Sequence, residues 1–211
     1  MLRHIRGITA ITAVVLLLTV CSSLRATVVA PGGSIGPPAV IGSLPPGAAT
    51  ATISGGYSMV DAFFNVTGTG TYSVKVWSPD TGTGFTTFVM NVAVATGEVG
   101  RLTMTNFAGF TTDVFAFGAG TNATTVDRSP TGGTVGFNFA SALQPGASTV
   151  QFVIRTNSPT YATGSLQIID GGVANEISFA PVPLPAAAWA GLALMGFVTA
   201  KKLHHSRRFQ V

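Results

Sequence analysis

The fold class is indicated by residues 71–77, Thr-Tyr-Ser-Val-Lys-Val-Trp. In this stretch Tyr72, Val74 and Val76 alternate with the more polar Ser73 and Lys75. Successive side chains on a β-strand point to opposite sides of a sheet, so a period of two predicts a strand with one buried face. The same period recurs in residues 149–155, Thr-Val-Gln-Phe-Val-Ile-Arg, where the second, fourth and sixth side chains are expected inside.

Runs rich in β-branched and aromatic residues continue from residue 53 to residue 180, separated by Gly, Asn, Asp and Pro. This succession is typical of antiparallel sheets, and no convincing amphipathic helical period interrupts it. We therefore predict an all-β fold, an antiparallel β-sandwich of the jelly-roll or Ig-like type. The expected strands are residues 57–66, 71–77, 85–94, 100–107, 113–118, 134–139, 149–156, 165–169 and 176–179.

The region before this domain is rich in chain breakers. Residues 27–52 contain Pro31, Pro37, Pro38, Pro45 and Pro46, which oppose both helices and interior strands. We predict a mostly extended leader over residues 27–52, with room for one edge strand around 39–41. The ectodomain proper is then expected to be a single unit over residues 53–180.

The first 26 residues have the pattern of a secretory signal peptide. Arg3 and Arg6 precede an uncharged apolar run over residues 8–20, and Ala26 offers a small residue for cleavage. Cys21, the only cysteine, lies within this segment. The mature chain should therefore contain no disulfide, and its stability must come from core packing.

The charge distribution bears on possible partners. The whole chain has a formal net charge of +4. Residues 27–180, however, contain all seven acids and only four basic residues, a balance of −3. A nucleic-acid partner would require a basic surface on the folded part, so we predict none.

The C-terminal region, residues 181–211, has three parts. Val182-Pro183-Leu184-Pro185-Ala186 is followed by an uncharged apolar segment, 186–200, and then by a basic tail over residues 201–208. The apolar segment would form a short transmembrane helix of about 22 Å, less than the roughly 30 Å hydrocarbon core. The basic residues Lys201, Lys202, Arg207 and Arg208 should hold its end on the cytoplasmic side.

This three-part tail resembles the PEP-CTERM sorting signal of Gram-negative bacteria, in its variant that begins Val-Pro-Leu-Pro-Ala. Leu184 stands where the commoner form of the signal has Glu. The resemblance implies export by the Sec machinery, transient retention in the inner membrane, and processing by an exosortase-type membrane enzyme. The mature protein would then reach the cell surface or the extracellular matrix, for example of a biofilm.

Residues for catalysis are scarce. His4, His204 and His205 lie in the two terminal segments, so Ser-His-Asp, Cys-His and His-ligated zinc chemistry are not expected in the domain. Asp80, Asp113, Asp127 and Asp170 border predicted turns, where Asp favours local hydrogen bonds. We predict no enzymatic activity, no cofactor and no metal site.

The sequence therefore predicts an exported protein with a structural or interaction role. One alternative is a carbohydrate-binding module for extracellular polysaccharide, in which Trp77 would form an exposed platform for sugar rings. Tyr57, Tyr72 and Tyr161 are further candidates for such a platform. The other alternative is a glycoside hydrolase that uses two of the carboxylates.

Overall fold

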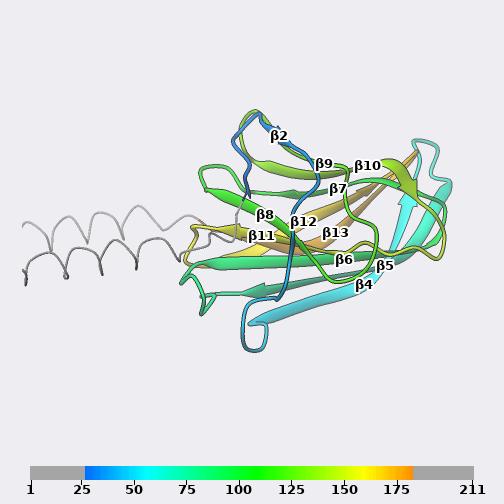
Figure 1. The fold of residues 1–211 in the computed structure, drawn as a ribbon. Coiled ribbons are helices and arrows are strands. Elements are labelled where there is room, and N and C mark those ends of the chain that lie inside the picture. The colour runs from blue at the N-terminus through cyan, green and yellow to red at the C-terminus, as the bar shows by residue number, and fades with distance from the viewer. Residues whose placement is uncertain (1–26, 183–211) are drawn as a thin grey trace, which may run out of the picture.

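The computed structural model describes residues 27–182, and all regular secondary structure in this range is β (Figure 1). Thirteen strands form one continuous sheet, antiparallel throughout except where β3 pairs with β8. The strands are β1 (Thr27–Val28), β2 (Ser34–Ile35), β3 (Val40–Ile41), β4 (Ala51–Val60), β5 (Val66–Trp77), β6 (Thr86–Thr96), β7 (Val99–Thr105), β8 (Thr112–Phe117), β9 (Thr125–Arg128), β10 (Thr134–Leu143), β11 (Gln151–Thr156), β12 (Tyr161–Ile169) and β13 (Val173–Pro181). The prediction of an all-β, antiparallel fold is confirmed.

The sheet curls until its two halves face each other, with β4, β5 and β6 below and β7, β9 and β10 above (Figure 1). The strand order is β1-β8-β11-β6-β5-β4-β13-β12-β7-β10-β9-β2. The halves are joined between β4 and β13, where Val60 pairs with Val173. The result is a nearly closed, barrel-like sheet, so two separate sheets of a sandwich are not confirmed.

Aromatic residues fill the space between the two halves. The Phe137 ring of β10 stacks on the Phe152 ring of β11 with centroids 4.4 Å apart, although these strands are distant in the sheet order. Tyr72, Val74 and Val76 are buried, as their alternation predicted. The core therefore takes its side chains from one face of each strand.

The chain turns where one continuous strand was predicted, over residues 57–66. β4 ends at Val60 and β5 begins at Val66, and the Asp61 carboxylate accepts hydrogen bonds from the backbone N–H groups of Phe63 (2.8 Å) and Asn65 (2.9 Å). These bonds form a tight turn that leaves Phe63 and Phe64 more than four-fifths exposed. The prediction failed because Phe and Val favour strands, whereas the side chain of Asp61 supplies the turn.

The leader is built into the domain. Its strands β1 and β3 pair with β8, and β2 pairs with β9, so residues 27–41 run between two distant edges of the sheet. β3 matches the edge strand expected around residues 39–41. Further along, Ile41, Leu44 and Ala49 pack on an outer apolar cluster of Trp77, Val89, Phe115 and Val153.

Arg128 of β9 joins the leader to the rest of the sheet. Its buried guanidinium donates hydrogen bonds to four backbone carbonyl oxygens: Val29 (3.1 Å), Gly132 (3.0 Å), Phe107 (2.7 Å) and Phe110 (2.7 Å). Burial lowers the pKa of Arg128. The aligned carbonyl dipoles compensate the buried charge, because hydrogen bonds to charged groups are stronger than neutral ones.

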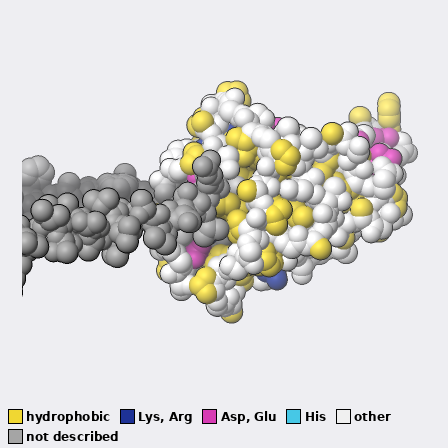
Figure 2. Space-filling view, in the orientation of Figure 1, with side chains coloured by type: hydrophobic (Ala, Val, Ile, Leu, Met, Phe, Trp, Pro, Cys, Tyr) yellow, Lys and Arg dark blue, Asp and Glu magenta, His cyan; other side chains and the backbone are white. Residues whose placement is uncertain are grey.

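The surface is mostly uncharged. Figure 2 shows white polar and backbone atoms interspersed with hydrophobic side chains, and few charged groups on this face. Within residues 27–182, no helix is long and apolar enough to cross a membrane. The predicted signal peptide and C-terminal helix lie outside the described residues.

We expect Arg128→Met to lower the free energy of unfolding of the domain by about 3–5 kcal/mol, because four inward-facing carbonyls would each lose a charged hydrogen-bond donor. Urea unfolding of residues 27–182 measures this change. Lys75→Met, which removes a partly exposed charge, is the control and should change stability by less than about 0.5 kcal/mol. Equal unfolding midpoints for the two variants would show that the Arg128 contacts do not hold the leader.

Candidate functional site

Val182, the first residue of the predicted sorting motif, is fixed to the domain. The Val182 N–H donates to the Thr160 carbonyl (3.3 Å), and the Val182 carbonyl accepts from the buried Ser158 hydroxyl (3.0 Å). The loop after β11 therefore holds the chain at the point where the motif begins. The motif residues Pro183, Leu184, Pro185 and Ala186 and the basic residues Lys201, Lys202, Arg207 and Arg208 lie outside the described residues.

The N-terminal end of the described chain lies at the same end of the sheet, on the left in Figure 1. Val29 donates its N–H to the Thr112 carbonyl, and Thr112 pairs with Thr156 across β8 and β11. Thr156 is two residues from Ser158, which binds Val182. Both ends of the described chain thus leave from one pole, which we call the tail pole.

A polar row crosses the outer face of the sheet at the tail pole. Arg155 of β11 pairs in register with Thr87 of β6 on one side and with Asp113 of β8 on the other. Its guanidinium lies 5.2 Å from the centroid of the Phe115 ring, and its Nε lies 3.6 Å from Oδ2 of Asp80. The row therefore places one guanidinium between two carboxylates.

Asp80 stabilises the turn between β5 and β6. Its buried carboxylate accepts hydrogen bonds from the Gly82 N–H (2.8 Å) and the Thr87 hydroxyl (2.7 Å). Both oxygens are engaged by neighbours in the chain, as the predicted turn role requires. Asp80 is consequently a poor proton donor or nucleophile for an external substrate.

Asp113 differs from Asp80, because its Oδ1 is buried and has no hydrogen-bond partner. Burial raises the pKa of Asp113, and the neighbouring Arg155 charge partly offsets this effect. Asp113 lies inside β8 and borders a pocket of about 300 Å³ that also includes Phe85, Arg155 and Asn157. Because Asp113 Oδ1 and the unpartnered Nε of Arg155 are both buried, neither atom is open to a ligand from solvent. Among residues 27–182, no group of three or more His, Cys, Asp or Glu side chains is placed to hold a metal ion.

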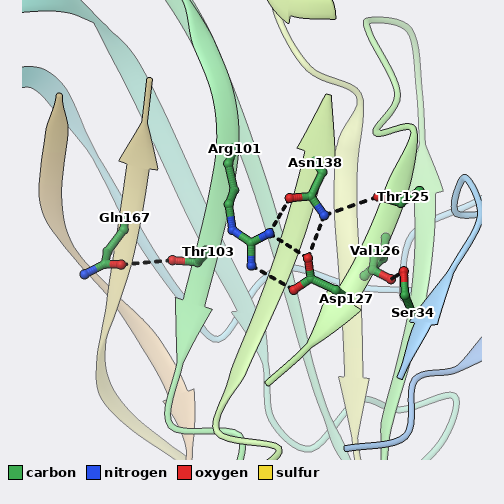
Figure 3. A network of polar contacts seen from close by, with 8 residues as sticks. All are labelled: Ser34, Arg101, Thr103, Thr125, Val126, Asp127, Asn138 and Gln167. Carbon is green, nitrogen blue, oxygen red and sulfur yellow. Dashed lines mark hydrogen bonds and ion pairs between the residues drawn. The ribbon is translucent and has the colours of Figure 1, made fainter. Parts of the chain in front are cut away.

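A second polar network lies on the outer face of β7, β9 and β10 (Figure 3). Arg101 contacts the Asp127 carboxylate through both terminal nitrogens, at 2.6 and 2.7 Å, and also binds Asn138. The hydrogen bond from Arg101 lowers the pKa of Asp127, with further help from Asn138. Gly136 makes room for this pair, since a Cβ there would lie 2.7 Å from Oδ1 of Asp127 and closer still to Arg101. These side chains satisfy one another across three strands, so the network is structural.

The proposed aromatic platform is wrong. Trp77 is buried beneath the leader, and its indole N–H donates to the Gly47 carbonyl (3.2 Å). Tyr57 and Tyr72 are also buried, and burial raises the pKa of Tyr57 to about 12. Tyr161 packs edge-on against Phe179. The prediction failed because it treated the outer face of β5 as exposed, whereas residues 41–49 cover it.

Sequence reasoning missed the pairing of Asp113 with Arg155. The two residues are far apart in the chain, and only the register between β8 and β11 brings them together. The visible signal was weak: a charged side chain at the end of each of two apolar strands.

Comparison with known proteins gives no relative: no family model, no curated protein and no solved structure matches this chain.

We expect Gly136→Ala to force Arg101 and Asp127 apart and to lower stability at pH 7 by about 1 kcal/mol, a modest value because both side chains are about one-third exposed. Because the folded-state pKa of Asp127 is lowered, its contribution is present above the unfolded pKa, about 3.9, and is lost as pH falls below it. The difference between variant and parent should therefore shrink between pH 7 and pH 3.

Urea midpoints at the two pH values measure this effect. Gly42→Ala is the control, because a Cβ there would meet no atom within 4 Å. A Gly136→Ala deficit that is the same at pH 3 and pH 7 would show that the clash, and not the loss of the ion pair, causes the destabilisation.

Proposed function

We propose that this chain is an exported, non-enzymatic protein that is processed at its C-terminal tail and then acts at the cell surface or in the extracellular matrix. In this proposal the Sec machinery exports it, the inner membrane retains it for a time, and an exosortase-type enzyme processes the tail. The domain has a structural or interaction role. Its two facing half-sheets would serve as the layers of a sandwich-like module of the jelly-roll or Ig-like kind.

The common tail pole is the observation that carries the proposal. Thr27 follows the predicted signal peptide, and Val182 begins the motif that precedes the apolar segment 186–200. Both attachments enter one bilayer in the precursor. A domain whose ends leave from the same pole meets this requirement without a long linker, and the rest of the domain points away from the membrane.

The chemistry of the motif supports its exposure to a membrane enzyme. Ser158 and Thr160 hold Val182, so the segment offered for processing begins directly beyond the domain. Pro183 and Pro185 lack backbone donors and favour an extended chain. Small residues such as Ala187 and Gly191 leave one side of the apolar segment thin, which permits close approach of another helix.

Each of the two alternatives loses a candidate residue. The hydrolase alternative loses one carboxylate, because both oxygens of Asp80 are engaged within its own turn. The carbohydrate-binding alternative loses its platform, because Trp77, Tyr57 and Tyr72 are buried.

The proposed topology is tested with a reporter that is active only in the cytoplasm. Fused after Val182, it should be inactive, because residues 27–182 are expected in the periplasm. Fused after Val211, beyond the basic tail, it should be active in the unprocessed precursor. Strong activity of the Val182 fusion would overturn the proposed topology.

The role of the motif is tested by replacing both Pro183 and Pro185 with alanine. This variant should still be exported, but the full-length chain should accumulate in the inner membrane because the enzyme no longer finds an extended segment. Membrane fractionation with mass measurement of each form gives the result. The matched control replaces Pro45 and Pro46 in the leader and should be processed normally. If the Pro183/Pro185 variant is released like the parent, residues 182–186 are only a linker.

A further inference from the structure

One side of β4 is a long strand edge without a partner. On its other side, every residue of β4 from Ala51 to Val60 pairs with β5. On the free side only Val60 pairs, with Val173 of β13, so residues 51–59 have no second strand partner within residues 27–182. In Figure 1, β4 forms the lower margin of the sheet. An unpaired edge of this length is a template for another strand.

The other edges of the sheet are protected against such pairing. The leader covers the edges of β8 and β9 with the short strands β1, β2 and β3. The edge of β13 contains Glu176 and ends at Pro181, and both a charge and a proline oppose strand addition. Residues 51–60 of β4 contain no charged residue and no proline. The edge of β4 therefore has none of these protections.

The side chains of β4 do not shield its edge either. Inner and outer positions alternate strictly, and the exposed positions between Ala51 and Met59 carry only small residues: Thr52, Ser54, Gly56 and Ser58. On the inner face, Ile53 packs against the core but is only partly buried. A strand beside β4 would therefore satisfy its backbone groups and cover more of Ile53.

The unpaired stretch 51–59 is complementary to itself in an antiparallel pair. Its midpoint is Gly55, so a two-fold axis at Gly55 pairs the whole stretch with the same stretch of a second copy. This register sets inner side chains opposite inner ones and outer opposite outer, whereas a slip of one residue would mix the two faces. Ile53 then lies opposite Tyr57, Thr52 lies opposite Ser58, and no like charges meet.

From these features we infer that two copies of this chain pair through β4, antiparallel and centred on Gly55, so that one sheet continues across the dimer. A second copy is the occupant that the edge favours. An uncharged edge of small side chains has no charge with which to select a foreign strand, whereas β4 itself offers a strand of equal length with matching faces. The same patch on both copies is the arrangement that a two-fold dimer requires.

The direction of β4 gives this pairing a consequence at the membrane. β4 begins at the tail pole, where the Thr50 hydroxyl donates to the Ser78 carbonyl (3.4 Å) and the Ser78 hydroxyl donates to the Pro159 carbonyl (3.2 Å). An antiparallel pair therefore points its two tail poles in opposite directions. Copies attached to one membrane could not pair in this way, and release would permit it. This consequence rests on the proposed function, but the pairing itself does not.

The test is sedimentation velocity of the full chain in a detergent that is density-matched to the buffer. The protein concentration runs from about 2 to about 200 µM, which brackets a micromolar dissociation constant. We expect the parent to dimerise over this range. Thr52→Lys combined with Ser58→Lys sets like charges directly opposite each other twice in the dimer, and should raise the dissociation constant at least fivefold. Thr52→Lys combined with Ser58→Glu sets opposite charges there and should restore dimerisation.

Two controls locate the contact. Ser141→Lys combined with Thr163→Lys adds the same charge at exposed positions of β10 and β12 and should leave dimerisation unchanged. Urea midpoints establish that each variant is folded. Hydrogen exchange of the parent needs no variant: the amides of residues 51–59 should become more protected from the lowest to the highest concentration, and those of β10 should not.

The inference is overturned if the parent stays monomeric at the highest concentration, or if its residues 51–59 gain no protection there. It is also overturned if the folded two-lysine variant dimerises like the parent, which would place the contact elsewhere in the chain. A charge-paired variant that stays monomeric would contradict the register centred on Gly55. If the two-lysine variant does not fold, hydrogen exchange and the charge-paired variant decide the question. None of these outcomes depends on tail processing.

Discussion

The structure depends on closing the two ends of its sheet, and Arg128 provides the central interaction. A curled sheet that stopped at β8 and β9 would expose two edges with unpaired backbone groups. The leader crosses between these edges, pairing with β8 through β1 and β3 and with β9 through β2. The buried Arg128 guanidinium binds carbonyls of the leader and of two turns, so it holds these separate segments together.

This closure also organises the two ends of the domain. Because β1 pairs Val28 with Asp113, the leader begins beside the polar row that contains Arg155. The C-terminal end reaches the same pole through Ser158. At the opposite end of β5, the Asp61 turn presents Phe63 and Phe64 to solvent. The two ends of the described chain therefore share one pole, and the most exposed apolar side chains occupy the other.

Much of the fold could be predicted from the sequence, because alternation in residues 71–77 and 149–155 reports directly on burial in a strand. The strand pairing of the leader could not be predicted from the sequence, since its Pro and Gly residues indicate only that no long element forms there. The alternative that exposed Trp77 as a sugar platform failed because a local pattern does not show which distant segment covers a face. The Asp113–Arg155 pair depends on the register between β8 and β11, and the Arg128 contacts depend on where the leader and two turns meet β9. Single-strand periodicity contains neither kind of information. The predicted signal peptide and the motif residues beyond Val182 lie outside the described residues.

The most direct test of the central claim, export followed by tail processing, is the intact mass of the protein released by its native host. One spectrum determines both ends of the mature chain. We expect a mass that lacks the signal peptide and the residues beyond the Val182–Ala186 motif, with any added group visible as a defined increment. A released protein whose mass extends through Val211 would contradict processing at the tail.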